Sequence, residues 1–273
     1  MTRTTGHYAL ASILALTLIA GCGEKATEKT AAEPAAPAPA AAAQITIYEA
    51  ALAHPSRPAA DRQSDIGRKP GEVLEFMGIE PGMTVLDMFS GGGWYAEVIA
   101  HVVGENGHVI AHSNEAYKSF VGDALAERFD GVRVPNVDIL MAENNQLSLE
   151  ENSLDAVMLA QSFHDLYHSE PEGGWELIDG PAFLAELKKG LKPGGIVAII
   201  DHTAVEGAPP ETGDSLHRID PGLVIANMEA AGFVLEARSD ILSNADDDLT
   251  QTVFAEGIRG KTSRFAMRFR NPR

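Results

Sequence analysis

From Met83 to Arg270 the sequence alternates short apolar runs with longer amphipathic runs, whose apolar residues recur at spacings of three and four. The apolar runs predict strands, and the amphipathic runs predict helices. We expect strands at 83–88, 108–113, 137–142, 154–160, 196–201, 233–240 and 263–270, and helices at 71–79, 94–104, 117–129, 181–191 and 221–232. This alternation is typical of a doubly wound α/β domain, in which helices cover both faces of a mostly parallel, seven-stranded sheet. We therefore expect one domain over residues 45–273.

The first predicted strand runs directly into a glycine-rich loop, in the stretch VLDMFSGGGWYAE from Val85 to Glu97. In an open α/β sheet, ligands bind at the carboxyl ends of the strands, beside the first strand. Glycines let backbone N–H groups approach a ligand closely, and the following helix points its positive end at the ligand. The loop therefore predicts a site for a nucleotide-like ligand, with an ordinary tight turn as the alternative.

Two classes of nucleotide cofactor fit such a loop. Gly91, Gly93 and Ala96 have the G-x-G-x-x-A spacing of dinucleotide-binding folds. In those folds, however, the strand runs straight into the first glycine, whereas residues 87–90 stand between strand and glycines here.

An acid that ends the first strand and is followed by a glycine loop resembles the class I S-adenosylmethionine-dependent methyltransferases. The resemblance covers roughly residues 70–270. Residues 154–159 resemble the fourth strand of that family, and Leu191-Lys192-Pro193-Gly194-Gly195 is similar to its turn before strand five. Ala231-Gly232-Phe233 and the last strand match its carboxyl-terminal part. The resemblance implies a Rossmann-like methyltransferase fold and S-adenosylmethionine as cofactor.

The resemblance also assigns roles to individual residues. Asp87 would organise the loop and face the ligand, and Gln161 would line the floor near the sulfonium. Residues approaching the methionine part of the cofactor would be Ser90, Gly91, Gly92 and Gly93.

The chain departs from the family pattern at three places. Phe89 stands where the family usually has the first glycine, and Ser113-Asn114-Glu115 stands where it has an acid for the ribose. Met141 replaces the aspartate near the adenine. We expect Asn114 to bind the ribose, with Glu115 or Glu143 as substitutes for the missing acids.

Several ionisable residues follow the fourth and fifth predicted strands. His164, Asp165 and Tyr167 follow strand four, and Asp201 and His202 end strand five. Since the carboxyl ends of parallel strands share one edge, these side chains should converge over the cofactor. We expect His164 or His202 to act as general base, Asp165 or Asp201 to orient it, and Tyr167 to shape the acceptor pocket. Hydrogen-bonded loop residues without a catalytic role are the alternative.

A metal site is a further alternative in this region. His164 and His168 are four residues apart, and His202, His217 or an aspartate could complete a nitrogen and oxygen site for an ion such as Zn²⁺. The spacing matches no known metal signature, and we assign no metal.

The charge of the chain limits its partners. A formal net charge of −18 disfavours nucleic acid and anionic lipid as partners. Arg57, Arg62 and Arg68 could reach an anionic ligand, or could pair with Asp61 and Asp65.

The amino terminus resembles a bacterial lipoprotein signal peptide. Arg3 precedes a 12-residue apolar run from Ala9 to Ala20, too short to span a membrane. Ile19-Ala20-Gly21-Cys22 resembles the lipoprotein box, which implies lipidation of Cys22, the single cysteine. We expect residues 1–21 to be the signal peptide and residues 22–44, rich in Ala and Pro, to be a disordered tether. The protein would then be lipid-anchored on the periplasmic side of the cell envelope, and Gly23, rather than Asp, after the cysteine is compatible with the outer membrane.

These features together predict an envelope-anchored methyltransferase that acts on a small molecule or an envelope component. A non-catalytic ligand-binding or sensor module on the same scaffold is the first alternative, because fold does not fix function. A metal-dependent hydrolase that uses the histidine loops is the second.

Overall fold

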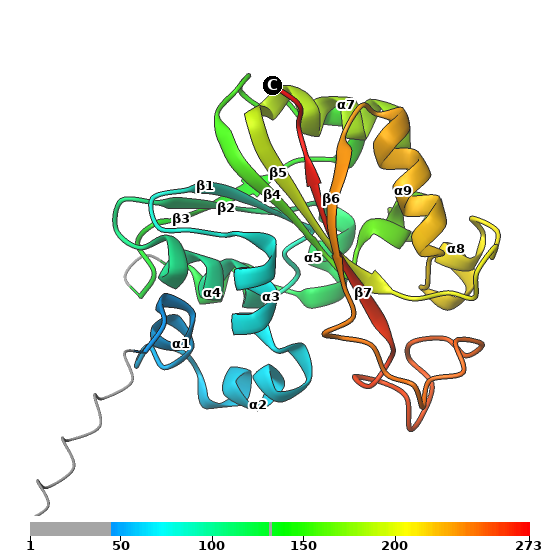
Figure 1. The fold of residues 1–273 in the computed structure, drawn as a ribbon, viewed down its shortest axis with the longest axis horizontal. Helices are drawn as coiled ribbons and strands as arrows, with labels where there is room; N and C mark the ends of the chain where they lie inside the picture. The colour runs from blue at the N-terminus through cyan, green and yellow to red at the C-terminus, as the bar shows by residue number, and fades with distance from the viewer. Residues whose placement is uncertain (1–44, 131–132) are drawn as a thin grey trace, which may run out of the picture. The chain divides into compact units, whose positions relative to one another are not determined.

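The computed structural model describes residues 45–130 and 133–273 (Figure 1). The predicted signal peptide, Cys22 and the predicted tether lie outside the described residues. No helix of the described part of the chain is long and apolar enough to cross a membrane.

One sheet of seven strands forms the centre of the domain, in the order β3-β2-β1-β4-β5-β7-β6 (Figure 1). The strands are β1 (Thr84–Met88), β2 (His108–Ser113), β3 (Val137–Met141), β4 (Leu154–Ala160), β5 (Leu191–His202), β6 (Val234–Ser239) and β7 (Arg264–Arg270). The strands β1 to β5 pair in parallel, whereas β7 is antiparallel to both of its neighbours, β5 and β6. The sheet is therefore mixed, and it has the strand order of the predicted Rossmann-like methyltransferase fold.

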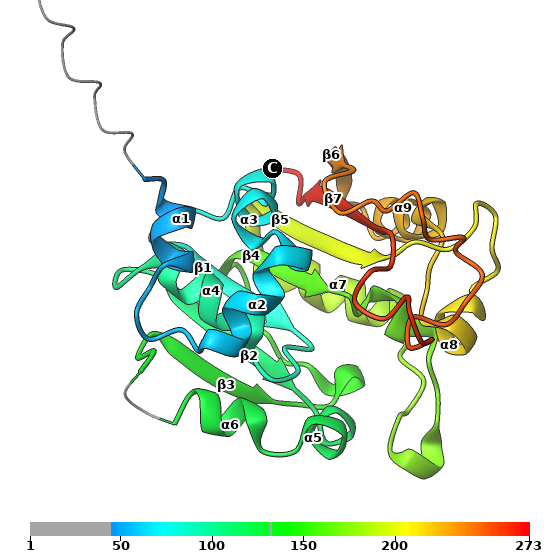
Figure 2. The ribbon, with the colours of Figure 1, turned by 90° about the horizontal axis from the view of Figure 1, so that it is seen from below.

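Helices cover both faces of the sheet and bury a separate core on each face (Figures 1 and 2). On one face the helices α1, α3 and α4 contribute to a core with apolar side chains of β1, β2 and β5. On the other face α7 and α9 do the same. The helices are α1 (Ile47–Leu52), α2 (Ala59–Arg68), α3 (Pro70–Met77), α4 (Trp94–Val103), α5 (Glu115–Val121), α6 (Ala124–Arg128), α7 (Gly180–Gly190), α8 (Thr212–Leu216) and α9 (Pro221–Ala230).

The observed elements differ from the sequence prediction at several places, and the short helices α1 and α8 were not among the expected ones. The helix expected at 117–129 is broken into α5 and α6, because Gly122 ends α5 with a φ of +66° that a helix cannot contain. β5 begins at Leu191 instead of residue 196, and a register shift in β4 opposite residues 191–196 absorbs the expected turn. The helix α2 was not predicted, because its sequence is mostly polar and none of its residues is buried in an apolar core.

The carboxyl ends of β1, β4 and β5 lie side by side, since β4 pairs with both β1 and β5. These ends carry Asp87, Gln161 and His202, so the fold brings the predicted cofactor loop and the predicted catalytic segments to one edge of the sheet.

Candidate active site

The glycine loop is a left-handed turn that joins β1 to α4. Phe89, Gly91 and Gly93 have φ values of +54°, +56° and +77°. The backbone N–H of Ser90 donates to the carbonyl of His112 on β2 at 2.9 Å, and its hydroxyl donates to the carbonyl of Asp87 at 2.8 Å. The loop is therefore fixed from both strands that flank it.

The carboxyl group of Asp87 is buried beneath this loop, with 1% of the residue exposed. Burial raises the pKa of Asp87 to about 7. Its Oδ2 atom has no hydrogen-bond partner among the described residues. A buried acceptor of this kind is costly unless a donor reaches it, and a polar ligand or an ordered water can supply that donor.

Space for such a ligand lies against the loop. Apart from Gly91 and its two neighbours in the chain, no described residue has an atom within 4 Å of the place where a Cβ on Gly91 would stand. The side chain missing at Gly91 and the unpaired oxygen of Asp87 fit a ligand that contacts the backbone closely. These residues therefore fit S-adenosylmethionine, with Ser90 to Gly93 placed to hold it.

The predicted ribose and adenine residues border a cavity of about 220 Å³, which is lined in part by Phe89, Asn114 and Glu143. The Asn114 side chain caps α5, accepting from the backbone N–H of Tyr117 at 2.8 Å. Glu143 accepts from the backbone N–H of Glu115 at 3.3 Å. The structure thus brings Asn114 and Glu143 together, with an amide where the family has its ribose-binding acid.

Phe89 holds its left-handed backbone inside an aromatic cluster. Its ring lies 5.5 Å from that of His112, 5.4 Å from that of Tyr117 and 5.8 Å from that of Phe183. A left-handed conformation costs an ordinary residue about 1–2 kcal/mol. Burial of the ring offsets that cost, which explains how the loop keeps its shape without the usual glycine.

Gln161 ends β4 in another left-handed conformation, with a φ of +63°. Its backbone N–H donates to the carbonyl of Ile200 at 2.6 Å. The residue lines two adjoining cavities of about 410 and 530 Å³. Backbone strain of this kind concentrates at functional sites, and the position is the one expected for the floor near the sulfonium.

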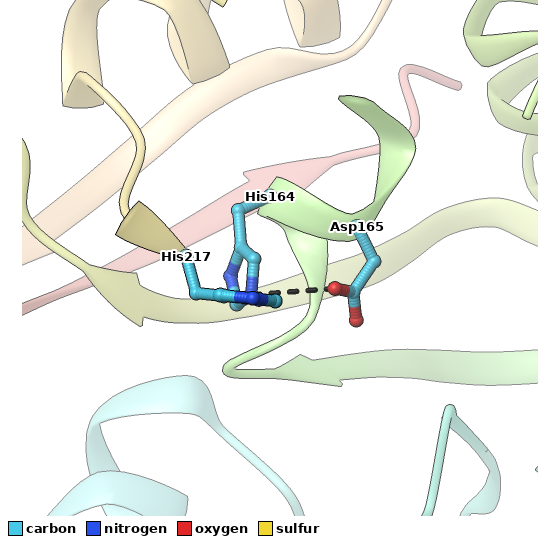
Figure 3. A group of neighbouring side chains, drawn as sticks. All are labelled: His164, Asp165 and His217. Atoms are coloured by element: carbon cyan, nitrogen blue, oxygen red, sulfur yellow. Dashed lines mark ion pairs between the residues drawn. The ribbon is translucent and has the colours of Figure 1, made fainter. Parts of the chain in front are cut away.

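His164 lies between the carboxylates of Asp201 and Asp165, and Figure 3 shows its pair with Asp165. Its Nδ1 is 2.8 Å from Oδ1 of Asp201, and its Nε2 is 3.3 Å from Oδ1 of Asp165. Burial opposes protonation of the imidazole, but the charges of Asp201 and Asp165 outweigh it and raise the pKa of His164 to about 9. At neutral pH His164 is therefore a cation, which makes it a poor general base.

His202 has the opposite protonation state. Burial lowers its pKa to about 3, and the nearby charges of His164, Arg264 and Arg218 add to that effect against the attraction of Asp201. Its Nδ1 is 2.7 Å from the hydroxyl of Thr262, and its Nε2 has no hydrogen-bond partner within the described ranges. His202 is thus the neutral imidazole of the site, and Thr262, rather than Asp165 or Asp201, orients it.

The structure does not support the role expected for Tyr167. Its hydroxyl accepts from Nδ2 of Asn227 on α9 at 2.7 Å, and the residue lines neither of the two adjoining cavities. The 3₁₀ turn at Phe163–Tyr167 directs His164 and Asp165 to the cavity side and Tyr167 to α9.

The metal ligand set considered from the sequence is also rearranged. His164, Asp165 and His217 place one donor atom each within 4.8 Å of one another (Figure 3). His168 is instead paired with Asp214 at 2.8 Å. Two imidazoles and a carboxylate could hold a divalent cation. The contacts of protonated His164 with two aspartates already satisfy these groups without one.

Sequence reasoning missed Tyr117 and Thr262. Tyr117 donates its hydroxyl hydrogen bond to Oδ2 of Asp165, and Thr262 contacts His202 across 60 positions of the chain. Neither residue stands in a motif, so only the tertiary structure reveals these pairings.

Known proteins share this architecture. Residues 86–199 match the family described as "Methyltransferase domain". The ubiquinone/menaquinone biosynthesis C-methyltransferase UbiE of Shewanella piezotolerans is 29% identical over 130 residues, which are 47% of this chain and 46% of that protein. The chain therefore matches about half the length of the curated relatives it resembles.

Two solved structures share the fold. A SAM-dependent methyltransferase from Aquifex aeolicus is 28% identical, with a TM-score of 0.56 over 77% of this chain and 94% of that chain. A putative methyltransferase of Haloferax volcanii, in complex with the activator Trm112, is 15% identical with a TM-score of 0.54 over 85% of this chain and 100% of that chain, and shares the fold. Over residues 86–199 the chain is therefore similar to a methyltransferase domain, and its fold is that of solved S-adenosylmethionine-dependent methyltransferases.

Proposed function

We propose that the protein transfers the methyl group of S-adenosylmethionine to a small molecule or to a component of the cell envelope. The observation that carries this proposal is the convergence of the glycine loop, Gln161 and the neutral imidazole of His202 at one edge of the sheet. The two adjoining cavities there have room for an acceptor beside the cofactor.

In methyl transfer, the main contribution of the protein is to position the reactants. The bound cofactor supplies the methyl group on a sulfonium. Ser90 to Gly93 would hold the cofactor, and the chain's own part would be to orient the acceptor's nucleophilic atom toward that methyl group. Where the acceptor atom carries a proton, Nε2 of His202 is placed to accept it, while Gln161 lines the same space.

Calorimetric titration of the full-length protein with S-adenosylhomocysteine tests the cofactor site. Gly91→Ala adds a methyl group in the space beside the loop, and Gly82→Ala is its matched control at the amino end of β1. Both glycines have a positive φ and no described atom within 4 Å of an added Cβ. We expect micromolar binding that Gly91→Ala abolishes and Gly82→Ala keeps. Wild-type protein that does not bind would contradict the proposal.

A non-catalytic ligand-binding module is the second candidate, and the observation that favours it is Phe89 in place of the first loop glycine. His202→Gln separates the two. An enzyme loses transfer of tritiated methyl groups to envelope extract while keeping its affinity for S-adenosylhomocysteine. A binding module shows no transfer in either protein.

A metal-dependent hydrolase would use the cluster of His164, Asp165 and His217. Elemental analysis of protein purified without added ions decides this case. Stoichiometric metal that His217→Ala removes would favour the hydrolase over methyl transfer.

We also infer that Cys22 is lipidated and that residues 22–44 tether the domain on the periplasmic side of the envelope. The support for this inference is the resemblance of residues 1–22 to a lipoprotein signal peptide. In this arrangement only the lipid contacts the membrane, and the domain itself, with its acidic charge, stays away from anionic lipid and nucleic acid.

A further inference from the structure

The larger of the two cavities is bordered by segments that are far apart in the sequence. It has a volume of about 530 Å³ and lies between α2, the ends of β4 and β5, and the segment 253–264 that leads into β7. It shares Gln161, His202 and Phe254 with the neighbouring cavity of about 410 Å³, which reaches His164. The larger cavity is therefore continuous with the proposed acceptor site.

Three arginines line this cavity, namely Arg68, Arg259 and Arg264, and no carboxylate lines it. Within residues 45–130 and 133–273, none of the three forms a salt bridge. Other arginines of the chain do: Arg57 pairs with Asp65 at 2.7 Å, and Arg218 pairs with Asp247 at 2.8 Å. In a chain with 39 acidic residues and a net charge of −18, a cavity with cations alone is a pronounced local reversal of charge.

Arg264 gives the strongest indication that this cavity binds an anion. Only 7% of the residue is exposed, and its guanidinium donates to backbone carbonyls alone, to Gly67 at 2.7 Å and to Thr262 at 3.4 Å. A guanidinium stays charged at all physiological pH values, so its burial without a counter-charge is unfavourable. Burial and the charge of Arg68 both lower the pKa of Arg264.

Aromatic rings hold the other two guanidiniums in place. Arg68 lies over the ring of Trp94, 4.5 Å from its centroid, and Arg259 lies 5.8 Å from the ring centroid of Phe254. Such stacking fixes the direction of a guanidinium and leaves its N–H groups free to bind a carboxylate or phosphate.

We propose that the methyl acceptor is an anion, whose carboxylate or phosphate group binds Arg68, Arg259 and Arg264 while its nucleophilic atom faces His202 and Gln161. This proposal rests on the proposed function and specifies the class of substrate. The bound anion would also make His202 a better proton acceptor. Because Arg264 is one of the groups that lower the pKa of His202, an anion beside Arg264 raises that pKa toward the range in which an imidazole accepts a proton efficiently.

The cofactor itself carries a carboxylate, and this is the other source of the same chemistry. The experiment must therefore measure the cofactor and an independent anion separately. Inorganic phosphate and benzoate serve as probes, because neither contains any part of the cofactor.

The test uses full-length wild type and the Arg259→Gln and Arg264→Gln variants. Arg238→Gln is the matched control, because Arg238 is an exposed arginine on β6 outside the cavity. Arg259 is exposed, so its variant should fold even if Arg264→Gln does not. Calorimetry gives the affinity for phosphate and for benzoate without cofactor, and the affinity for S-adenosylhomocysteine in a separate titration.

We expect wild type to bind at least one of the two anions, and each cavity variant to weaken that binding about tenfold or more, with Arg238→Gln unchanged. The affinity for S-adenosylhomocysteine should stay the same in all four proteins. Absence of anion binding in wild type, or binding that survives both cavity substitutions, overturns the proposal. A parallel loss of S-adenosylhomocysteine affinity also overturns it, by assigning the arginines to the cofactor's carboxylate. Failure of the proposed function looks different, since wild type would then not bind S-adenosylhomocysteine at all.

Discussion

At Phe89 the strained backbone and the buried ring make opposing contributions to the free energy of unfolding. Its backbone has a φ of +54°, which disfavours any side chain, and its ring is 5% exposed within an aromatic cluster. Removal of the ring and relief of the backbone therefore have opposite effects on the free energy of unfolding.

Phe89→Ala and Phe89→Gly test this balance. Loss of the buried ring destabilises both variants by about 3–5 kcal/mol, but glycine also relieves the left-handed backbone, so Phe89→Gly should be the more stable by about 1 kcal/mol. Denaturant unfolding measures the difference. At Phe183, a buried residue on α7, the order should reverse, because glycine weakens an ordinary helix. The same order at both positions would show that the backbone at Phe89 is not strained.

His164 should make the stability depend on pH. Its pKa is about 9 in the folded protein and 6.5 in the unfolded chain, so the folded state binds the proton more tightly. The stabilisation is complete below pH 6.5 and is lost as the pH rises through 9. We expect the advantage of wild type over His164→Gln in unfolding free energy to fall by about 3 kcal/mol between about pH 6 and pH 10.

His108→Gln is the control for this pH series, since His108 contacts Asp138 on the surface at 3.2 Å. Its difference from wild type should stay nearly constant, because exposed pairs contribute little. A flat profile for His164→Gln as well would mean that the two aspartates do not hold a proton on His164.

Sequence and structure agree best where a residue acts through its own neighbours in the chain. The acid, serine and glycines of the loop could be placed from the local motif alone. The state of His164 and His202 could not, because it depends on Asp201, Thr262 and Arg264, which reach them across tens of residues. Burial, which decides both pKa values, is a property of the folded chain.

At the scale of elements, ion pairs join the polar helices α2 and α6 to α4. Glu97 on α4 has no exposed surface and pairs with Arg128 on α6 at 2.5 Å and also with Arg133. Arg128 pairs in turn with Asp61 on α2 at 2.5 Å. This network explains how α2 and α6, which bury few apolar side chains, keep their places.

Glu97→Gln should therefore destabilise the domain by about 3 kcal/mol, since it leaves two arginines without their buried partner. Burial opposes ionisation of Glu97, but His101, Arg133 and Arg128 lower its pKa to about 2 from 4.5. Its stabilisation is thus present above pH 4.5 and is lost as the pH falls through 2. Glu236→Gln, which breaks exposed pairs with Arg268 and Arg270, should cost less than about 1 kcal/mol. Equal losses in urea unfolding would argue against the network.

The strands were predicted well because each buried strand carries its own apolar signal. The polar helix α2 was not predicted. Its ion pairs join residues that are far apart in the chain, so they produce no apolar pattern from which a helix could be recognised. The apolar spacing on both sides of Gly122 predicts one continuous helix. That spacing does not reveal the positive φ of Gly122, which separates α5 from α6.

At the scale of the whole molecule, the proposed anchor would give the residues before position 45 a task separate from that of the domain at residues 45–273. The net charge of −18 opposes direct contact with anionic membranes, so a lipid on Cys22 would be the means of attachment.

Expression of the full chain in a bacterium tests the anchor. Mass spectrometry of the membrane fraction should find an amino-terminal peptide that begins at Cys22 and carries diacylglycerol. The Cys22→Ser variant should keep residues 1–21 attached or lose the lipid. Wild-type protein that starts at Met1 and stays out of the membrane fraction would refute the anchor.

The position of β7 has a consequence for the order in which the protein can be made. β7 is the last strand in the sequence, yet in the sheet it lies between β5 and β6. Within the described chain, β6 pairs with no strand other than β7. Until the ribosome has added residues 264–270, β6 has no strand to pair with, and the cavity lacks Arg264. A nascent chain therefore cannot complete its sheet or its arginine-lined cavity early, and under the export proposed above this delay would give it time to cross a membrane before folding.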